Sequence, residues 1–275
     1  MSFKTSVCHY SFHRLWKEEN WDCDKLCEEV KDTGSEGVDF HEKLTADPDT
    51  ARERITKAIE KSGLALSGIS LSNDYNVADA AELEKRLATS RTWIDIGADL
   101  KAPVMRIFGG GRSDEDRQVQ FDRIVEAMKK ITEHAVAKGV VLALENHGGI
   151  PLTGEEQSKM IEAVGSDNFK ATIDVGNYMS GGQEGVDGSK AAAKHCGYVH
   201  FKDFLKVPST EKPWGWATKP CTVGVGAVDH EGCLKHLADA GYSGWVALEY
   251  EGRTDERIGV EESIYYMKKV MSRFA

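Results

Sequence analysis

Short apolar segments recur along this chain at a nearly constant spacing, and most are followed by a turn and a segment of helical periodicity. The first and eighth segments begin at Thr5 and Trp245, a mean spacing of about 34 residues, the size of one strand–helix unit. The eight expected strands are 5–9, 37–41, 65–71, 104–108, 140–145, 170–174, 198–200 and 245–250. Eight such units predict an α/β fold, a single-domain (β/α)8 TIM barrel spanning 1–275. An open doubly wound sheet is the rival, but no GxGxxG follows the first segment.

Helical periodicity fills the intervals between these segments. The expected helices are 22–32, 50–62, 78–95, 116–138, 154–164, 230–240 and 255–270, with a short unit near 190–196. A long loop, 204–228, follows the seventh strand and contains Trp214 and Trp216. Loops of this length are often active-site lids, so we expect it to cover the site and bring a tryptophan to the substrate. A packed surface loop or an oligomer contact is the alternative.

Composition excludes several classes of function. The 275 residues contain 35 Lys+Arg and 45 Asp+Glu, and the net charge of −10 opposes binding to nucleic acid or an anionic membrane. The first five residues lack the apolar core of a signal peptide, so we expect a cytoplasmic location. The six cysteines include no CxxC pair, and in that compartment we expect no disulfide. A small-molecule partner is favoured, and a homo-oligomer is left open.

Four strands in succession end in a side chain that binds metals. Glu145 and Asp174 end the fifth and sixth segments, His200 ends the seventh, and Glu249 lies in the eighth. Because large apolar residues alternate with them, all four have the parity that points into the barrel. Three crowded carboxylates repel one another unless a cation lies between them. Carboxylate and imidazole ligands suit one divalent ion, Mn²⁺, Mg²⁺, Co²⁺ or Zn²⁺. The competing interpretation is that each carboxylate caps a helix or pairs with a lysine.

Five short motifs occur in an order that resembles the xylose-isomerase-like TIM-barrel family of sugar phosphate isomerases and epimerases. They are LENHGG (144–149), IDVGN (173–177), VHFKD (199–203), GVGAVD (224–229) and LEYE (248–251). The resemblance implies that Glu145, Asp174, His200 and Glu249 bind the metal, and that the two glutamates also form the catalytic acid–base pair. The chain departs from the family at Asn177, where many members have a histidine that contacts substrate. The net negative charge and the small histidine set disfavour the endonuclease branch.

Other polar residues near the strand ends are candidate substrate contacts. We expect His147, Asn177, Lys202, Arg106 and His9 to bind substrate. Four of these have structural alternatives: Arg106 can pair with Glu145, Lys202 can form a salt bridge, His147 can orient Glu145, and His9 can be a buried structural histidine. Asp39 and His41 also have inward parity.

The predicted activity is metal-dependent isomerisation or epimerisation of a sugar or sugar phosphate. Such enzymes move a proton next to a carbonyl, through an enediolate that the metal stabilises. The same first step also begins elimination, so a dehydratase or lyase acting on a keto-sugar or keto-inositol is the alternative. A non-catalytic sugar-binding barrel is the alternative of another class.

Overall fold

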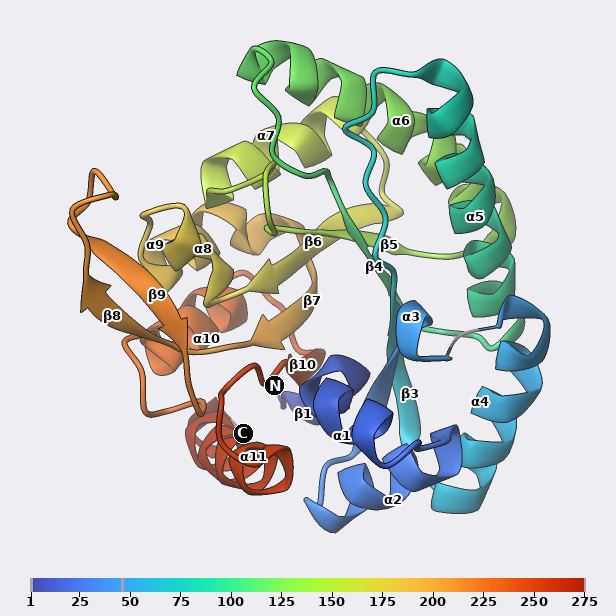
Figure 1. Cartoon of the computed structure of the whole chain (residues 1–275), viewed down its shortest axis with the longest axis vertical. Coiled ribbons are helices and arrows are strands. Elements are labelled where there is room, and N and C mark those ends of the chain that lie inside the picture. The colour runs from blue at the N-terminus through green and yellow to red at the C-terminus, as the bar shows by residue number, and fades with distance from the viewer. Residues whose placement is uncertain (1, 46, 275) are drawn as a thin grey trace.

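The computed structural model describes residues 2–45 and 47–274 and confirms the predicted closed parallel barrel (Figure 1). Around the barrel the strands follow the order β1-β10-β7-β6-β5-β4-β3-β2. Their bounds are β1 Lys4–Cys8, β2 Gly37–His41, β3 Ala65–Ser70, β4 Met105–Phe108, β5 Leu142–Glu145, β6 Phe169–Asp174, β7 Cys196–Phe201 and β10 Trp245–Leu248. The largest differences from the predicted bounds are two residues each: β5 begins two residues later, β7 begins two residues earlier, and β10 ends two residues earlier.

Helices connect successive strands and surround the barrel (Figure 1). Their bounds are α1 His13–Glu18, α2 Cys23–Asp32, α3 Glu42–Thr45, α4 Pro48–Ser62, α5 Ala80–Asp99, α6 Arg117–Lys138, α7 Gly154–Val164, α8 Asn177–Ser180, α9 Gly185–Ala192, α10 His230–Asp239 and α11 Glu256–Met271. The short unit expected near 190–196 begins earlier, as α9. Helix α6 illustrates why these segments are helical: Asp116 accepts hydrogen bonds from the Gln118 and Val119 amides, and Gly139 ends the helix at φ 69°.

Alternation along the strands produces two separate cores. Leu144, Ile173 and Leu248 belong to the large core that also includes buried residues of the surrounding helices. A second, small cluster contains Val104, Ala143, Tyr198 and Ala247. Within their strands these residues alternate with the outward-facing ones, or lie where a strand begins, and they fill the barrel interior. The inward parity inferred from the sequence is therefore confirmed, and it directs the polar side chains at the strand ends toward the barrel axis.

The segment 204–228 is not an irregular loop throughout. It contains an antiparallel hairpin of β8 (Phe204–Pro208) and β9 (Trp216–Pro220), which projects beside α8 and α9 (Figure 1). Asp203 fixes the base of the hairpin, because its carboxylate accepts hydrogen bonds from the amides of Phe204, Gly224, Gly226 and Val228. A Cβ atom at Gly226 would lie 2.1 Å from Asp203 Oδ1, so only glycine fits this turn.

All six cysteines are free, as predicted. Cys23 and Cys27 are buried along α2, where they act as small apolar residues. Among residues 2–45 and 47–274, no helix has both the length and the apolar character needed to cross a bilayer.

Candidate metal centre and active site

The four predicted ligands converge at one end of the barrel. Glu145 ends β5, Asp174 ends β6, His200 lies in β7 and Glu249 follows β10 directly. Asp174 and His200 are register partners, and the Glu249 amide donates to the Phe201 carbonyl, so adjacent strands hold the side chains level. One ligand atom from each lies within 4.8 Å of the others, and all four residues are buried.

The donor atoms of this cluster fit a divalent cation. Glu145 Oε2, Asp174 Oδ2, Glu249 Oε2 and His200 Nδ1 are buried, and none has a hydrogen-bond partner of normal geometry among the described residues. Burying four polar atoms that lack a well-formed hydrogen bond is costly, and a cation between them would reduce that cost. Three oxygens and one imidazole nitrogen also match the ligand preferences of Mn²⁺, Mg²⁺, Co²⁺ and Zn²⁺.

Two buried cationic side chains flank the carboxylates on opposite sides. Arg106 Nε lies 3.0 Å from Glu145 Oε2, and its Nη1 donates to the Leu71 carbonyl at 2.8 Å. Lys202 Nζ lies 2.6 Å from Glu249 Oε2 and 3.5 Å from Asp174 Oδ2. Each glutamate therefore has its own cationic partner, which partly neutralises it and restricts its orientation.

The pKa values show that this cluster strongly favours added positive charge. Burial raises the pKa of Glu145 to about 7, although Arg106 opposes the shift. Burial also disfavours the charged form of Glu249, yet Lys202 and His200 hold the pKa of Glu249 well below its usual range. Burial lowers the pKa of His200, but the Asp39 and Glu249 carboxylates outweigh it and raise that pKa to about 10. The directions of the Glu145 and His200 shifts both favour added positive charge at the cluster, which is the charge a cation would supply there.

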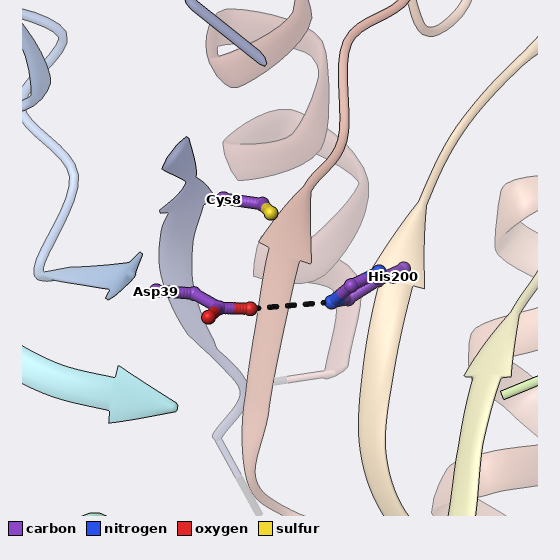
Figure 2. Close-up of side chains that lie close together, drawn as sticks. All are labelled: Cys8, Asp39 and His200. Carbon is purple, nitrogen blue, oxygen red and sulfur yellow. Dashed lines mark ion pairs between the residues drawn. The ribbon is translucent and has the colours of Figure 1, made fainter. Parts of the chain in front are cut away.

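Asp39, at the middle of β2, faces His200 across the barrel (Figure 2). Asp39 Oδ2 lies 3.4 Å from His200 Nε2, and the same oxygen accepts hydrogen bonds from Ser70 and Tyr198. Because His200 Nε2 faces Asp39, the other ring nitrogen, Nδ1, points toward Glu145. Carboxylates in this position orient metal-binding histidines and raise their basicity. Sequence parity placed Asp39 inside the barrel, but it did not reveal the contact with His200.

Cys8, at the end of β1, lies beside this pair (Figure 2). Its Sγ is within 4.8 Å of ligand atoms of Asp39 and His200. Burial raises the pKa of the Cys8 thiol, and the charge on Asp39 raises it further. Cys8 therefore stays a protonated thiol in the free cluster, where it fills space beside the carboxylate.

A cavity of about 760 Å³ adjoins the cluster and has the size of a small-ligand site. Among the predicted residues, Arg106, His147 and Glu249 line it. His147 stacks on Phe108 with 4.0 Å between ring centroids, and burial lowers the pKa of His147 to about 4. The residues lining the cavity are Tyr10, His13, Lys17, His41, Lys43, Leu44, Ser72, Asn73, Asp74, Arg106, Phe108, Gly110, Gly111, His147, Gly148, Glu249 and Glu251. A second, more open hollow of about 800 Å³ between α7 and α9 includes none of the four ligands.

Asn177 and Lys202 contact the carboxylates of the cluster but do not line the cavity. Asn177 Nδ2 donates to Glu145 Oε1 at 3.0 Å, and its Oδ1 accepts from Lys202 Nζ at 3.4 Å. Asn177 thus links Glu145 with Lys202, the cationic partner of Glu249. In this structure both residues support the carboxylates, and neither belongs to the described cavity lining.

The hairpin tryptophans lie away from this cavity. Trp214 packs closely against Gly182, and Lys206 Nζ lies 4.7 Å from the centre of the Trp216 ring. Neither tryptophan belongs to the described cavity lining. The expectation that segment 204–228 covers the site is therefore wrong for this conformation, because the hairpin packs toward α8 instead.

His9 is buried outside the cavity. Its ring contacts Trp16, with 4.0 Å between centroids, and Phe40, and neither ring nitrogen has a hydrogen-bond partner among the described residues. Burial lowers the pKa of His9 well below its usual value. The ring thus stays neutral and packs as an apolar group, which favours the structural alternative for His9.

We expect His9→Leu to make the protein less sensitive to acid. Because the folded-state pKa of His9 is lowered, the unfolded chain binds a proton that the folded chain does not. The contribution to stability is present above a pH of about 6.5 and falls by about 1.4 kcal/mol per pH unit below it. Urea unfolding at pH 7 and pH 5 should show a loss about 2 kcal/mol smaller in the variant than in the wild type. Equal losses in both proteins would contradict this role.

Comparison with known proteins agrees with the fold. Residues 27–270 match the family described as xylose isomerase-like TIM barrel. An inosose dehydratase from Clostridium botulinum is 26% identical over 141 residues, which span 48% of this chain and only 47% of that protein.

Two solved structures extend the likeness over almost the whole chain. A structure of L-ribulose 3-epimerase matches with TM-score 0.77 and 17% identity, covering 98% of this chain and 95% of its own. A structure of IOLI protein with a bound zinc atom matches with TM-score 0.81 and 15% identity, covering 99% of each chain. At such identities the structures establish the fold, and the family match spans most of the sequence. The chain belongs to the xylose isomerase-like TIM barrel family.

Proposed function

We propose that this chain is a divalent-metal-dependent isomerase or epimerase acting on a sugar or sugar phosphate. The observation that carries the proposal is the placement of the two glutamates. Glu145 and Glu249 occupy the ends of a four-strand arc, β5-β6-β7-β10, with Asp174 and His200 between them. A substrate bound within this arc has one carboxylate on each side, as a proton transfer between two faces of one carbon requires.

The residues divide into ligands, acid–base groups and supports. Glu145, Asp174, His200 and Glu249 hold the cation, which supplies positive charge that stabilises an enediolate. One glutamate removes the proton beside the carbonyl, and the other returns a proton from the opposite face, so the proton count balances. Water then exchanges protons with both carboxyl groups and restores their starting states.

The remaining residues hold the glutamates or meet the substrate. Arg106 and Lys202 fix the orientation of the glutamate beside each of them. Arg106 and His147 also line the cavity, where both can donate hydrogen bonds to substrate oxygens. Asn177 takes a supporting role, as its hydrogen bond to Glu145 indicates.

Dehydration of a keto-sugar or keto-inositol is the second candidate. The match to an inosose dehydratase supports it, because elimination begins with the same proton removal. Dehydration differs from epimerisation only after this step: a hydroxyl group on the neighbouring carbon leaves, and one glutamic acid protonates it so that it departs as water. A cytoplasmic location and a homo-oligomer stay predictions from the sequence.

Exchange of substrate protons with solvent tests the proposal. The protein loaded with Mn²⁺, Mg²⁺, Co²⁺ or Zn²⁺ is incubated in D₂O with ketoses, ketose phosphates and keto-inositols, and products are followed by mass spectrometry and NMR. Deuterium incorporation with formation of an isomer or epimer is the expected result. Incorporation followed by loss of water identifies a dehydratase. If no compound exchanges with any metal, the catalytic proposal is overturned in favour of a sugar-binding barrel.

A further inference from the structure

The lining of the cavity beside the cluster combines a buried group of residues with an exposed group. Its inner part contains Glu249 and Arg106, which belong to the ligand cluster and its partners. Its outer part includes residues of the segments that follow β1 and β2, among them Lys17 in α1 and Lys43 in α3. Figure 1 shows both helices near the barrel opening.

Aromatic contacts join these two segments into one wall. Tyr10 stacks on His13 with 4.5 Å between ring centroids, and it contacts His41 at 5.7 Å. Lys17 lies one helical turn after His13 and therefore shares its face of α1. Lys43 follows His41 by two residues, and its amide donates to His41 Nδ1. The aromatic wall thus has a lysine at each of its two flanks.

The carboxylates that line this cavity are already paired. Asp74 lies 3.3 Å from Arg86, and its Oδ1 accepts hydrogen bonds from two backbone amides. Glu249 and Glu251 lie 2.6 Å and 3.2 Å from Lys202. These two glutamates share a single lysine, so the charge around Lys202 stays negative in balance.

The two lysines, in contrast, have no partner. Lys17 and Lys43 are exposed, and within residues 2–45 and 47–274 neither ammonium group makes an ion pair or a hydrogen bond. His41 adds no charge, because burial lowers its pKa to about 3. Within residues 2–45 and 47–274, Lys17 and Lys43 are therefore the cationic groups of the lining that no carboxylate engages.

We propose that Lys17 and Lys43 bind an anionic substituent of the substrate, a phosphate or a carboxylate, at the end of the cavity away from the metal ligands. This assignment rests on the proposed function and narrows its substrate class. The carboxylate cluster repels an anionic group, and the lysines attract it, so the two ends together fix one orientation of the substrate. The carbonyl end then lies between the glutamates, and the anion lies between the lysines.

Anion binding to the purified full-length protein tests the assignment independently of turnover. Inorganic phosphate and acetate are each titrated into the wild type at low ionic strength by isothermal titration calorimetry. The double variant Lys17→Gln/Lys43→Gln should bind the anion at least about tenfold more weakly, because two charge-assisted contacts are lost. Preference for phosphate indicates a phosphorylated substrate, and preference for acetate indicates a carboxylate.

A matched control separates local binding from net charge. Lys85→Gln/Lys130→Gln removes two exposed lysines from α5 and α6, outside the cavity, and should leave anion affinity within about twofold of the wild type. Equal affinity in both double variants, or no saturable binding of either anion to the wild type, overturns the assignment. Failure of the proposed enzymatic function would be seen in a different experiment, as the absence of deuterium exchange with every compound.

Discussion

Glu249→Gln is expected to lower turnover by at least about 100-fold even when excess Mn²⁺ keeps the metal site filled, because a positioned base contributes about this much. The glutamine keeps the size of the side chain and an oxygen that accepts from Lys202 and contacts a cation. It removes the basic carboxylate. Steady-state rates with excess Mn²⁺, together with the metal content of the purified variant, measure the two effects separately. Circular dichroism and urea unfolding establish that the variant is folded.

Glu145→Gln should give a loss of similar size, since a proton must both leave and return. The two variants need not fail in the same way. In single-turnover experiments with a deuterium-labelled substrate, one variant should still exchange the proton of one epimer, and the other variant that of the opposite epimer. This asymmetry is expected only if the carboxylates serve opposite faces of one carbon. Full recovery of both variants by added metal would reduce the glutamates to ligands and leave His147 and Lys202 as candidate bases.

The sequence predicted the ligand cluster because strand periodicity decides it. Residues such as Leu144 and Leu248 must face the helices, and this places Glu145 and Glu249 on the opposite face without any long-range information. The order of strands in a barrel then brings the ends of β5, β6, β7 and β10 to one rim. Local patterns and one global rule were therefore sufficient for this part of the site.

Contacts across the barrel could not be predicted from these local patterns. Asp39 and His200 lie on β2 and β7, which are not neighbours in the sheet, so no register rule pairs them. Parity indicated only that each side chain points inward. Which inward side chains meet depends on the stagger of the strands and on the volume of residues such as Tyr198, and neither is local.

The hairpin in segment 204–228 and the burial of His9 away from the cavity were not predicted from the sequence, for a related reason. Segment 204–228 contains prolines and tryptophans that predict a loop, yet Asp203 organises it by accepting hydrogen bonds from the adjacent Phe204 amide and from three amides distant in sequence. His9 follows the first strand, where a substrate contact is a reasonable expectation. The backbone enters a short 3-10 helix at this point and turns the ring under Trp16 instead.

Asp174→Asn is expected to weaken binding of Mn²⁺ by at least about 100-fold, more than the loss typical of a residue that only orients a ligand. Asp174 Oδ2 is one of the buried oxygens without a hydrogen-bond partner, whereas Oδ1 accepts from the Gly176 and Asn177 amides. The asparagine oxygen can still accept the two amide hydrogen bonds, but the side chain loses the negative charge that binds the cation. Titration with a fluorescent competing chelator measures the affinity, and excess Mn²⁺ should restore part of the activity.

Asp39→Asn provides the graded comparison for the same measurement. Asp39 contacts only the distal nitrogen of His200, so its replacement should reduce metal affinity by about 10- to 100-fold, less than the loss of a ligand. An asparagine amide keeps the hydrogen bonds from Ser70 and Tyr198 if its oxygen takes the place of Oδ2, which preserves packing. The imidazole then loses the charge that favours its orientation and basicity. A decrease larger than that of Asp174→Asn would make Asp39 itself a ligand, and an unchanged affinity would show that packing alone orients His200.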